Sequence, residues 1–468
     1  MMDQPQPEVI YKDRMSDADA LMWGIEKDPA LRSTITTVTV LNGTIERSVV
    51  RREFERISRR IPRLRERVQS NPMSIAPPRW EIDPHFDLDY HLRFARVPGN
   101  GSVEDVLRMA QPMSMQSFDR ARPLWEALVV SDLDGERSAI IMKIHHSITD
   151  GVGGVRLMLE LFDLEPDAPE RPMPEAPTVR VLNQAERFAD AFAHETRRQA
   201  RFLSGLAGSG LQSASSALGD PVRSMESLGE LAASTARVLR PVSHPLSPLM
   251  TGRSLSTHFE HVTVPLDAAK KAGKTIGGTI NDTFVTGLVQ GFRLYHEDHG
   301  VELDTLRMGM PINVRAAEAA EVAGNDFVPA RFELPTGSAD LRDLMIAIRE
   351  RMLSARDEPA NQLVEVLSNV LNRLPTTVVT QIFGSMMKGL DFQASNVPGS
   401  PIPLYFRGVE MASVTPFGPV AGAAANVTLL SYQNDLNIGL NVDPAAISDP
   451  ERFVECVRRG YDQVIGLS

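Results

Sequence analysis

The chain has 468 residues, more than one ordinary hydrophobic core holds, so we expect two domains. Hydrophobic residues make up 42% and charged residues 23%, which is the balance of a folded globular protein and excludes a disordered chain. The formal net charge of −11 argues against nucleic-acid binding driven by bulk charge.

Cysteine content and hydropathy limit the expected compartment and membrane topology of the protein. Cys456 is the single cysteine, so an internal disulfide is excluded and a reducing compartment fits. Because apolar residues flank it at helical spacing, we expect a buried core thiol. Residues 1–5 lack the basic-then-apolar order of a secretion signal, and no run of about 18 apolar residues occurs. We therefore expect a cytoplasmic protein without a transmembrane helix, which leaves peripheral contact with the inner membrane or lipid droplets open.

The first third of the chain alternates predicted helices and strands. In chain order these are a helix at 15–25 capped by Ser16 or Asp17, a strand at 34–41, an amphipathic helix at 49–61, strands at 128–131 and 138–144 around a turn at Asp134-Gly135, and a helix at 152–164. The strand at 138–144 is apolar on both faces, which predicts a central strand covered on both sides.

A connector and a second α/β half follow. Residues 165–180 are rich in Pro and acidic residues, a linker signature, and helices are predicted at 181–206 and 222–239. The first of these carries Phe188 and Phe192 beside arginines, so it either packs on the protein or lies on an anionic membrane. The later elements are a strand at 259–264, helices from 266 and at 280–297, a strand at 306–311, a hairpin of 427–432 and 436–443 with its turn at Gln433-Asn434, and a helix from Asp449.

The most specific motif is HHxxxDG, formed by His145-His146-Ser147-Ile148-Thr149-Asp150-Gly151 at the end of the apolar strand. In a regular strand Ile140, Met142, Ile144 and His146 share one face and His145 lies on the other. A neutral imidazole, with an unperturbed pKa of about 6.5, can take a proton from a hydroxyl group near pH 7. The motif therefore favours transfer of an acyl group from a thioester to a hydroxyl acceptor.

Several further blocks occur in the order typical of one family. They are Ser16-Asp17-Ala18-Asp19-Ala20, Pro123-Leu124-Trp125, Asn281-Asp282, Asn313-Val314-Arg315, Gly324-Asn325 running on to Leu334-Pro335, Ser395-Asn396-Val397-Pro398-Gly399, and Asn426 to Tyr432. With these blocks the chain resembles the bacterial wax ester synthase/diacylglycerol acyltransferase family. That family belongs to the superfamily of CoA-dependent acyltransferases, which includes chloramphenicol acetyltransferase and peptide-synthetase condensation domains.

The resemblance implies a fold and a division of the chain. It implies an α/β protein of two chloramphenicol-acetyltransferase-like domains with mixed sheets, joined by a helical connector, with an active-site tunnel at their interface. The expected parts are an N-terminal domain at 1–175, the connector at 176–255 and a C-terminal domain at 256–468. The chain departs from the usual family pattern in the Ser147-Ile148-Thr149 centre of its motif, in Pro245-Leu246-Ser247 and Thr251-Gly252-Arg253-Ser254, and in Gly422-Ala423-Ala424-Ala425.

The resemblance also implies roles for the motif residues. His146 is the implied general base, acting on acyl-CoA as co-substrate without a metal or other cofactor. His145 either orients the neighbouring loop or is a hydrogen-bonded buried histidine. Asp150 invites a triad interpretation, but at a helix start it is better placed to cap the helix or pair with an arginine, and Gly151 permits a tight turn.

Four more residues are expected around the substrates. Asn281 is a candidate oxyanion donor or a helix N-cap, and Asp282 would steady the same turn. Trp125 either shapes the acyl channel or is a plain core tryptophan. Asn396 either lines the second wall of the site or forms a turn.

The predicted activity is acyl-CoA-dependent synthesis of triacylglycerol from diacylglycerol, with wax ester synthesis from a fatty alcohol as a second product. One alternative is a condensation-type or polyketide-associated acyltransferase with a carrier-bound donor. Another is a catalytically weak protein that coats lipid droplets. The sequence leaves acyl chain length, preferred acceptor and oligomeric state open.

Overall fold

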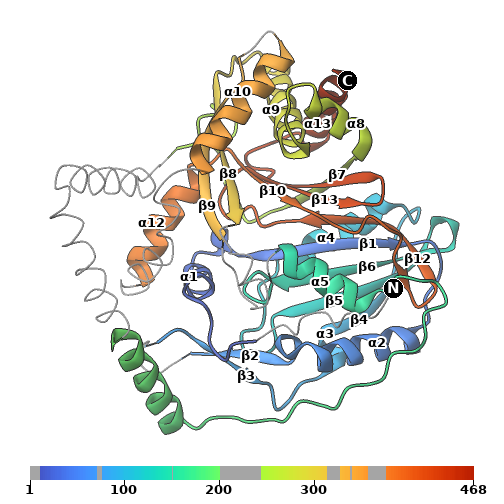
Figure 1. Cartoon of the computed structure of the whole chain (residues 1–468), viewed down its shortest axis with the longest axis vertical. Coiled ribbons are helices and arrows are strands. Elements are labelled where there is room, and N and C mark those ends of the chain that lie inside the picture. The colour runs from blue at the N-terminus through green and yellow to red at the C-terminus, as the bar shows by residue number, and fades with distance from the viewer. Residues whose placement is uncertain are drawn as a thin grey trace, which may run out of the picture.

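The computed structural model describes residues 11–70, 76–149, 151–200, 244–313, 327–337, 340–356 and 376–467. Two six-stranded sheets form the centre of the molecule (Figure 1). Helices α8, α9, α10 and α13 lie on the side of the second sheet that faces away from the first (Figure 1). The predicted α/β fold with two sheets is therefore confirmed.

The first half contains six strands and five helices among the described residues. They are α1 (Asp17–Ile25), β1 (Thr34–Leu41), α2 (Arg47–Arg60), β2 (Glu66–Gln69), β3 (Arg79–Ile82), α3 (Leu88–His91), β4 (Leu92–Arg96), α4 (Val103–Met115), β5 (Trp125–Leu133), β6 (Arg137–His145) and α5 (Gly151–Leu161). Ser16 caps α1 as predicted, because its hydroxyl accepts the Asp19 N–H at 3.0 Å.

The second half supplies the other sheet and its helical cover. Its described elements are β7 (His258–Pro265), α8 (Leu266–Lys274), α9 (Ile280–Asp298), β8 (Thr305–Asn313), β9 (Phe327–Pro335), α10 (Leu341–Arg356), α12 (Thr376–Lys388), β10 (Phe392–Val397), β11 (Tyr405–Phe406), β12 (Val409–Phe417), β13 (Ala425–Tyr432), β14 (Asp435–Val442) and α13 (Pro450–Ile465). The predicted hairpin with its turn at Gln433-Asn434 is confirmed by the antiparallel pairing of β13 with β14.

The sheets are mixed, and one segment crosses between the halves. The first sheet has the order β11-β12-β1-β6-β5-β4, and the second has the order β7-β14-β13-β10-β8-β9. Strands β11 and β12 fall within the predicted domain 256–468, yet β12 pairs with β1 of the first half. A strand pattern alone does not say which sheet a strand joins, so the sequence missed this exchange. The boundaries at 175 and 255 stay a prediction.

Strand β6 is central, as its apolar pattern predicts. It lies between β1 and β5, and all its residues after Arg137 are buried. Ile140, Met142 and Ile144 face one side, and Ile141 packs on the other side in a cluster that includes Val106 and Leu107 of α4. This buried strand fixes the position at which the motif begins.

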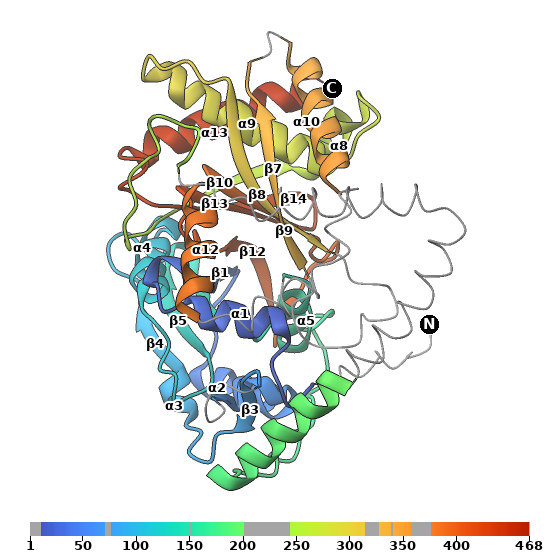
Figure 2. The ribbon, with the colours of Figure 1, turned by 90° about the vertical axis from the view of Figure 1, so that its left-hand side faces the viewer.

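The connector is described only in part. Residues 165–183 form neither helix nor strand, and a helix covers 184–200. The predicted helix at 222–239 lies outside the described residues. Helix α12 lies beside α1 (Figure 2), where the ammonium group of Lys388 pairs with Asp28 at 2.8 Å. Within the described ranges, no helix is long and apolar enough to cross a membrane.

Candidate active site

A cavity of about 330 Å³ lies where the two halves meet. Its walls come from α1, β1, β6 and α5 of the first half and from α12, β8, β9, β10, β13 and the end of β12 of the second. Most lining side chains are apolar, and six are methionines: Met22, Met142, Met158, Met310, Met386 and Met387. Because methionine is flexible and polarisable, such a wall can adapt to hydrocarbon chains of different shape.

Polar groups in the wall are few. Arg331 is the one formally charged side chain among the described lining residues, and His146 is the one imidazole. Hydroxyl groups come from Ser33, Thr149 and Ser395, among others. An apolar cavity with a small number of placed polar groups is the usual form of a small-molecule site.

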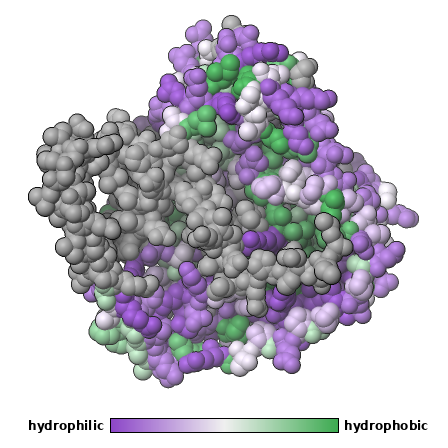
Figure 3. Space-filling view, viewed as in Figure 1, coloured by the Kyte–Doolittle hydropathy of each residue, from purple (hydrophilic) through white to green (hydrophobic). Residues whose placement is uncertain are grey.

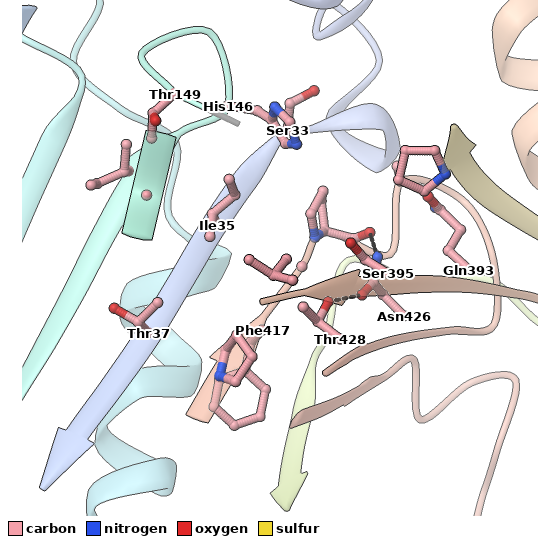
Figure 4. A pocket seen from close by; sticks show the side chains of 18 of the residues that line it. Ser33, Ile35, Thr37, His146, Thr149, Gln393, Ser395, Phe417, Asn426 and Thr428 are labelled. Atoms are coloured by element: carbon pink, nitrogen blue, oxygen red, sulfur yellow. Dashed lines mark hydrogen bonds between the residues drawn. The ribbon is translucent and has the colours of Figure 1, made fainter. Parts of the chain in front are cut away.

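His146 lies directly after the last residue of β6 and lines the cavity beside Ser33 (Figure 4). Its backbone N–H donates to the Ser33 carbonyl at 2.8 Å, which ties the residue to the start of β1. The side chain is half-buried, so a substrate in the cavity can reach the ring. The predicted face is therefore correct, since Ile140, Met142, Ile144 and His146 all line the cavity.

His145 points to the opposite face and is 1% exposed. The backbone N–H of Ser147 donates to its Nδ1 at 3.0 Å, so Nδ1 acts as an acceptor and carries no proton. The Ser147 hydroxyl also lies 2.6 Å from Nδ1. The ring proton is then on Nε2, which donates to Glu26 Oε1 at 2.9 Å. With its acceptor nitrogen occupied, His145 is a hydrogen-bonded buried histidine and is not placed to act as a base.

Glu26, just after α1, connects the two histidines. Its Oε1 also accepts the Ser33 N–H at 2.6 Å, and Ser33 in turn accepts from His146. Burial opposes ionisation of Glu26, but His145, the Ser33 N–H and Arg120 stabilise the carboxylate more and lower its pKa. Sequence reasoning missed Glu26, because an acidic residue at a helix end carries no motif of its own.

The unusual centre of the motif has a structural explanation. Ser147 is buried and holds the His145 ring, whereas Ile148 packs into the hydrophobic core of the first half. Thr149 lines the cavity, so of the three departures it is the one placed to contact a substrate. Gly151 begins α5, while Asp150 lies outside the described residues, so its predicted roles stay predictions.

Trp125 is fully buried and is not among the described residues that line the cavity. Its indole N–H donates to the Leu64 carbonyl at 2.8 Å, and its ring stacks on Phe54 and on His91. These contacts are those of a core tryptophan, the second of its two predicted roles. The ring supports the sheet that carries His146 without reaching the cavity.

Asn396, predicted on the second wall, and Asn281, the candidate oxyanion donor, contact each other outside the cavity. Asn396 Nδ2 donates to Asn281 Oδ1 at 3.3 Å, and neither side chain lines the cavity. The N-cap of α9 is Thr279, so Asn281 is not the cap, and Asp282 closes the capping box by accepting the Thr279 N–H at 2.6 Å. The predicted steadying role of Asp282 is confirmed. The predicted oxyanion role of Asn281 has no support from its position.

Other residues of the same sequence blocks reach the cavity instead. Ser395, next to Asn396, lines it, as do Asn426, Thr428 and Leu430 of β13. The alternation of Asn426, Thr428 and Leu430 is the period-2 signal of one strand face. That signal was available in the sequence, but it did not say that this face borders a cavity.

Known proteins resemble the chain over nearly its whole length. A family model described as the wax ester synthase/diacylglycerol acyltransferase catalytic domain matches residues 15–284, and one described as the WS/DGAT C-terminal domain matches residues 323–464. A Mycobacterium tuberculosis protein named as a diacylglycerol O-acyltransferase is 35% identical over 457 residues, covering 97% of this chain and 92% of its own. Another from the same species is 24% identical over 416 residues, covering 87% and 85%.

Solved structures support the fold. The wax ester synthase/diacylglycerol acyltransferase from Marinobacter aquaeolei VT8 aligns with a TM-score of 0.62 at 19% identity, covering 96% of this chain and 98% of its own. The first condensation domain of the calcium-dependent antibiotic synthetase aligns with a TM-score of 0.59 at 15% identity, covering 96% of each chain. The fold of this chain is thus shared with both proteins.

Proposed function

The chain belongs to the wax ester synthase/diacylglycerol acyltransferase family, and we propose that its cavity transfers an acyl group from acyl-CoA to the hydroxyl group of diacylglycerol. A long-chain alcohol is the second acceptor, which would give a wax ester. The observation that carries the proposal is the imidazole of His146 in the wall of an otherwise apolar cavity between the two halves.

In the proposed reaction His146 is the general base. Its ring takes the proton from the acceptor hydroxyl while that oxygen attacks the thioester carbonyl, giving a tetrahedral intermediate. The intermediate collapses with loss of the CoA thiolate, which receives the proton back from the imidazolium. The ester and free CoA balance the reaction, so no acyl-enzyme and no further cofactor are needed. A positioned base contributes about 10²–10⁴-fold to such a rate.

The walls suit both substrates of this reaction. Aliphatic and methionine side chains can surround an acyl chain and exclude water, which strengthens polar interactions at the reacting carbonyl. The network of Glu26, Ser33 and Ser147 holds the two histidines in place before substrate binds. Preorganisation of this sort reduces the reorganisation needed at the transition state.

Peripheral contact with a membrane or lipid droplet is part of the proposal, because diacylglycerol is dissolved in such phases. The helix 184–200 exposes Phe188 and Phe192, whose rings stack with centroids 6.5 Å apart. Its inner side is held by Arg187, which pairs with Glu81 at 3.0 Å. Hydrophobic side chains are visible at the lower left of Figure 3, where this helix lies in Figure 1. Exposed aromatic rings on a fixed helix suit insertion at a lipid interface.

The test is transfer from radiolabelled palmitoyl-CoA to diacylglycerol and to hexadecanol, side by side. His146→Ala should abolish the labelled ester, whereas the control His85→Ala, which changes an exposed histidine, should leave it unchanged. Undiminished activity in folded His146→Ala would refute the assigned base. No transfer by the wild-type chain to either acceptor would refute the substrates.

A further inference from the structure

One row of side chains crosses the whole second sheet in register. From β14 to β9 it runs through Asn441, Asn426, Gln393, Gly309 and Arg331, each paired with the next. Phe259 of β7 precedes Asn441 in the same row. Gln393, Gly309, Arg331 and Asn426 line the cavity, so this row faces the site.

The last residue of β12 and the residues after it lie across this row, with one residue against each of β7, β14, β13 and β10. The ring of Phe417 stacks on Phe259 with centroids 4.1 Å apart. Asn441 Nδ2 then donates to the Gly418 carbonyl at 2.8 Å, Asn426 Nδ2 to the Pro419 carbonyl at 2.9 Å, and Gln393 Nε2 to the Val420 carbonyl at 2.6 Å. We call residues 417–421 the strap and these three side chains the amide row.

Hydroxyl groups fix the orientation of two of the amides. Thr428 Oγ1 donates to Asn426 Oδ1 at 2.8 Å (Figure 4), and Thr257 Oγ1 donates to Asn441 Oδ1 in the same way. In Asn426 and Asn441 a hydroxyl group thus donates to the amide oxygen, and the amide nitrogen is left to donate to a carbonyl of the strap. Gly418 is required beneath the row, because a Cβ there would lie 2.6 Å from Asn426 Oδ1.

The strap is also a wall of the cavity. Phe417, Gly418, Pro419 and Ala421 line it. The strap ends where Ala421 and Gly422 adopt positive φ of 43° and 88°, so the backbone changes direction there. Beyond the strap, Gly309 and Leu390 line the cavity, and Leu390 packs so closely there that a Cβ on Gly309 would lie 2.7 Å from its side chain.

We propose that the amide row sets the position of the strap and thereby the length of acyl chain that the cavity accepts. Backbone carbonyls of an irregular segment would otherwise need water, and water is unfavourable against an apolar wall, so the amides replace it. Asn441, Asn426 and Gln393 are positioning residues in this proposal, because their amide N–H groups hold the strap carbonyls; Asn426 and Gln393 also line the cavity themselves. This inference deepens the proposed function and rests on it.

The experiment removes the amide N–H of one residue of the amide row at a time. Gln393→Glu and Asn426→Asp keep the shape and the acceptor oxygen but remove the N–H that holds the strap. The matched control is Gln463→Glu on α13, where Gln463 Oε1 accepts from Gln290 Nε2 at 2.8 Å, so that the carboxylate keeps the bond. Two quantities are measured: hydrogen exchange of the peptide spanning the strap, and kcat/KM for octanoyl-CoA against palmitoyl-CoA.

In Gln393→Glu and in Asn426→Asp, the backbone amides of the strap should exchange hydrogen faster than in wild type. The ratio of kcat/KM for palmitoyl-CoA to that for octanoyl-CoA should rise by about fivefold or more, because a released strap lets this wall of the cavity move outward. The control should leave both quantities within twofold of wild type. Unchanged exchange, or faster exchange with an unchanged ratio, would overturn the inference. If the wild-type chain transfers no acyl group, the proposed function fails, and the ratio of Kd values for the two acyl-CoA molecules takes the place of the kinetic ratio. A Kd ratio that does not change would then overturn the inference separately.

Discussion

Replacing Glu26 with Ala should destabilise the fold around Ser33 and His145. Glu26 Oε1 accepts the N–H of Ser33 at 2.6 Å and the Nε2–H of His145 at 2.9 Å, and both donors belong to buried residues. A buried donor left without a partner costs about 1–3 kcal/mol. Two such donors give an expected loss of about 2–6 kcal/mol in the free energy of unfolding.

The same change should also slow the proposed reaction. The backbone of Ser33 donates its N–H to Glu26 and accepts the His146 N–H at its carbonyl at 2.8 Å, so losing Glu26 loosens the residue that positions His146. Misplacing a catalytic group by about 1 Å can lower a rate about 10²-fold. We expect kcat to fall by up to that factor, with a smaller change in KM, because Glu26 does not line the cavity.

Urea unfolding and steady-state transfer kinetics of three proteins test this reasoning. Glu26→Gln keeps an oxygen where both donors point and loses the charge and the second oxygen, which pairs with Arg120, so it should recover most of the lost stability and rate. The reasoning is refuted if Glu26→Ala unfolds within about 0.5 kcal/mol of wild type, which is the usual range of a neutral surface change. It is equally refuted if Glu26→Gln is as damaging as Glu26→Ala.

Three further outcomes follow from the contacts. The pKa of Glu26 is lowered from its unfolded value of 4.5, so the stability that its charge contributes is present above that pH and is lost as the pH falls through the folded pKa. The free energies of unfolding of wild type and Glu26→Gln, measured in urea, should therefore differ less at pH 4 than at pH 7. A difference that does not change with pH would contradict this. Trp125→Phe leaves the Leu64 carbonyl without its hydrogen bond and should lower the free energy of unfolding in urea by about 1–3 kcal/mol. The rate of acyl transfer per folded molecule should stay unchanged. A selective loss of acyl transfer would place the ring in the site. Burial and the neighbouring Asp298 raise the pKa of Cys456 to about 11. Iodoacetamide at pH 8 should therefore label the thiol of the native protein far more slowly than that of the urea-unfolded protein. Rapid labelling of the native protein would refute the buried position.

Local patterns predicted most of the elements. The cap at Ser16, the strand at 34–41 and the hairpin after residue 425 depend on capping chemistry, β-branching and turn residues, which are properties of neighbouring residues. The assignment of His146 to one face of β6 succeeded for the same reason, because a strand alternates its sides with a period of two.

Predictions that needed contacts between distant segments were less successful. Trp125 and Asn396 stand in blocks typical of the family and were expected around the substrates, yet one lies in the core and the other contacts Asn281 outside the cavity. Their neighbours in space are 61 and 115 residues away along the chain. No spacing rule in a single sequence reports such a distance.

The sequence by itself determined the class of protein, the family, the HHxxxDG motif and which face of β6 carries His146. Tertiary structure decided that β12 joins the first sheet, that Glu26 holds both histidines through Ser33, and that an amide row clamps the strap along the cavity. The physical reason is that propensity and periodicity act between neighbours along the chain. A cavity wall and a hydrogen-bond network, in contrast, depend on which distant segments pack together.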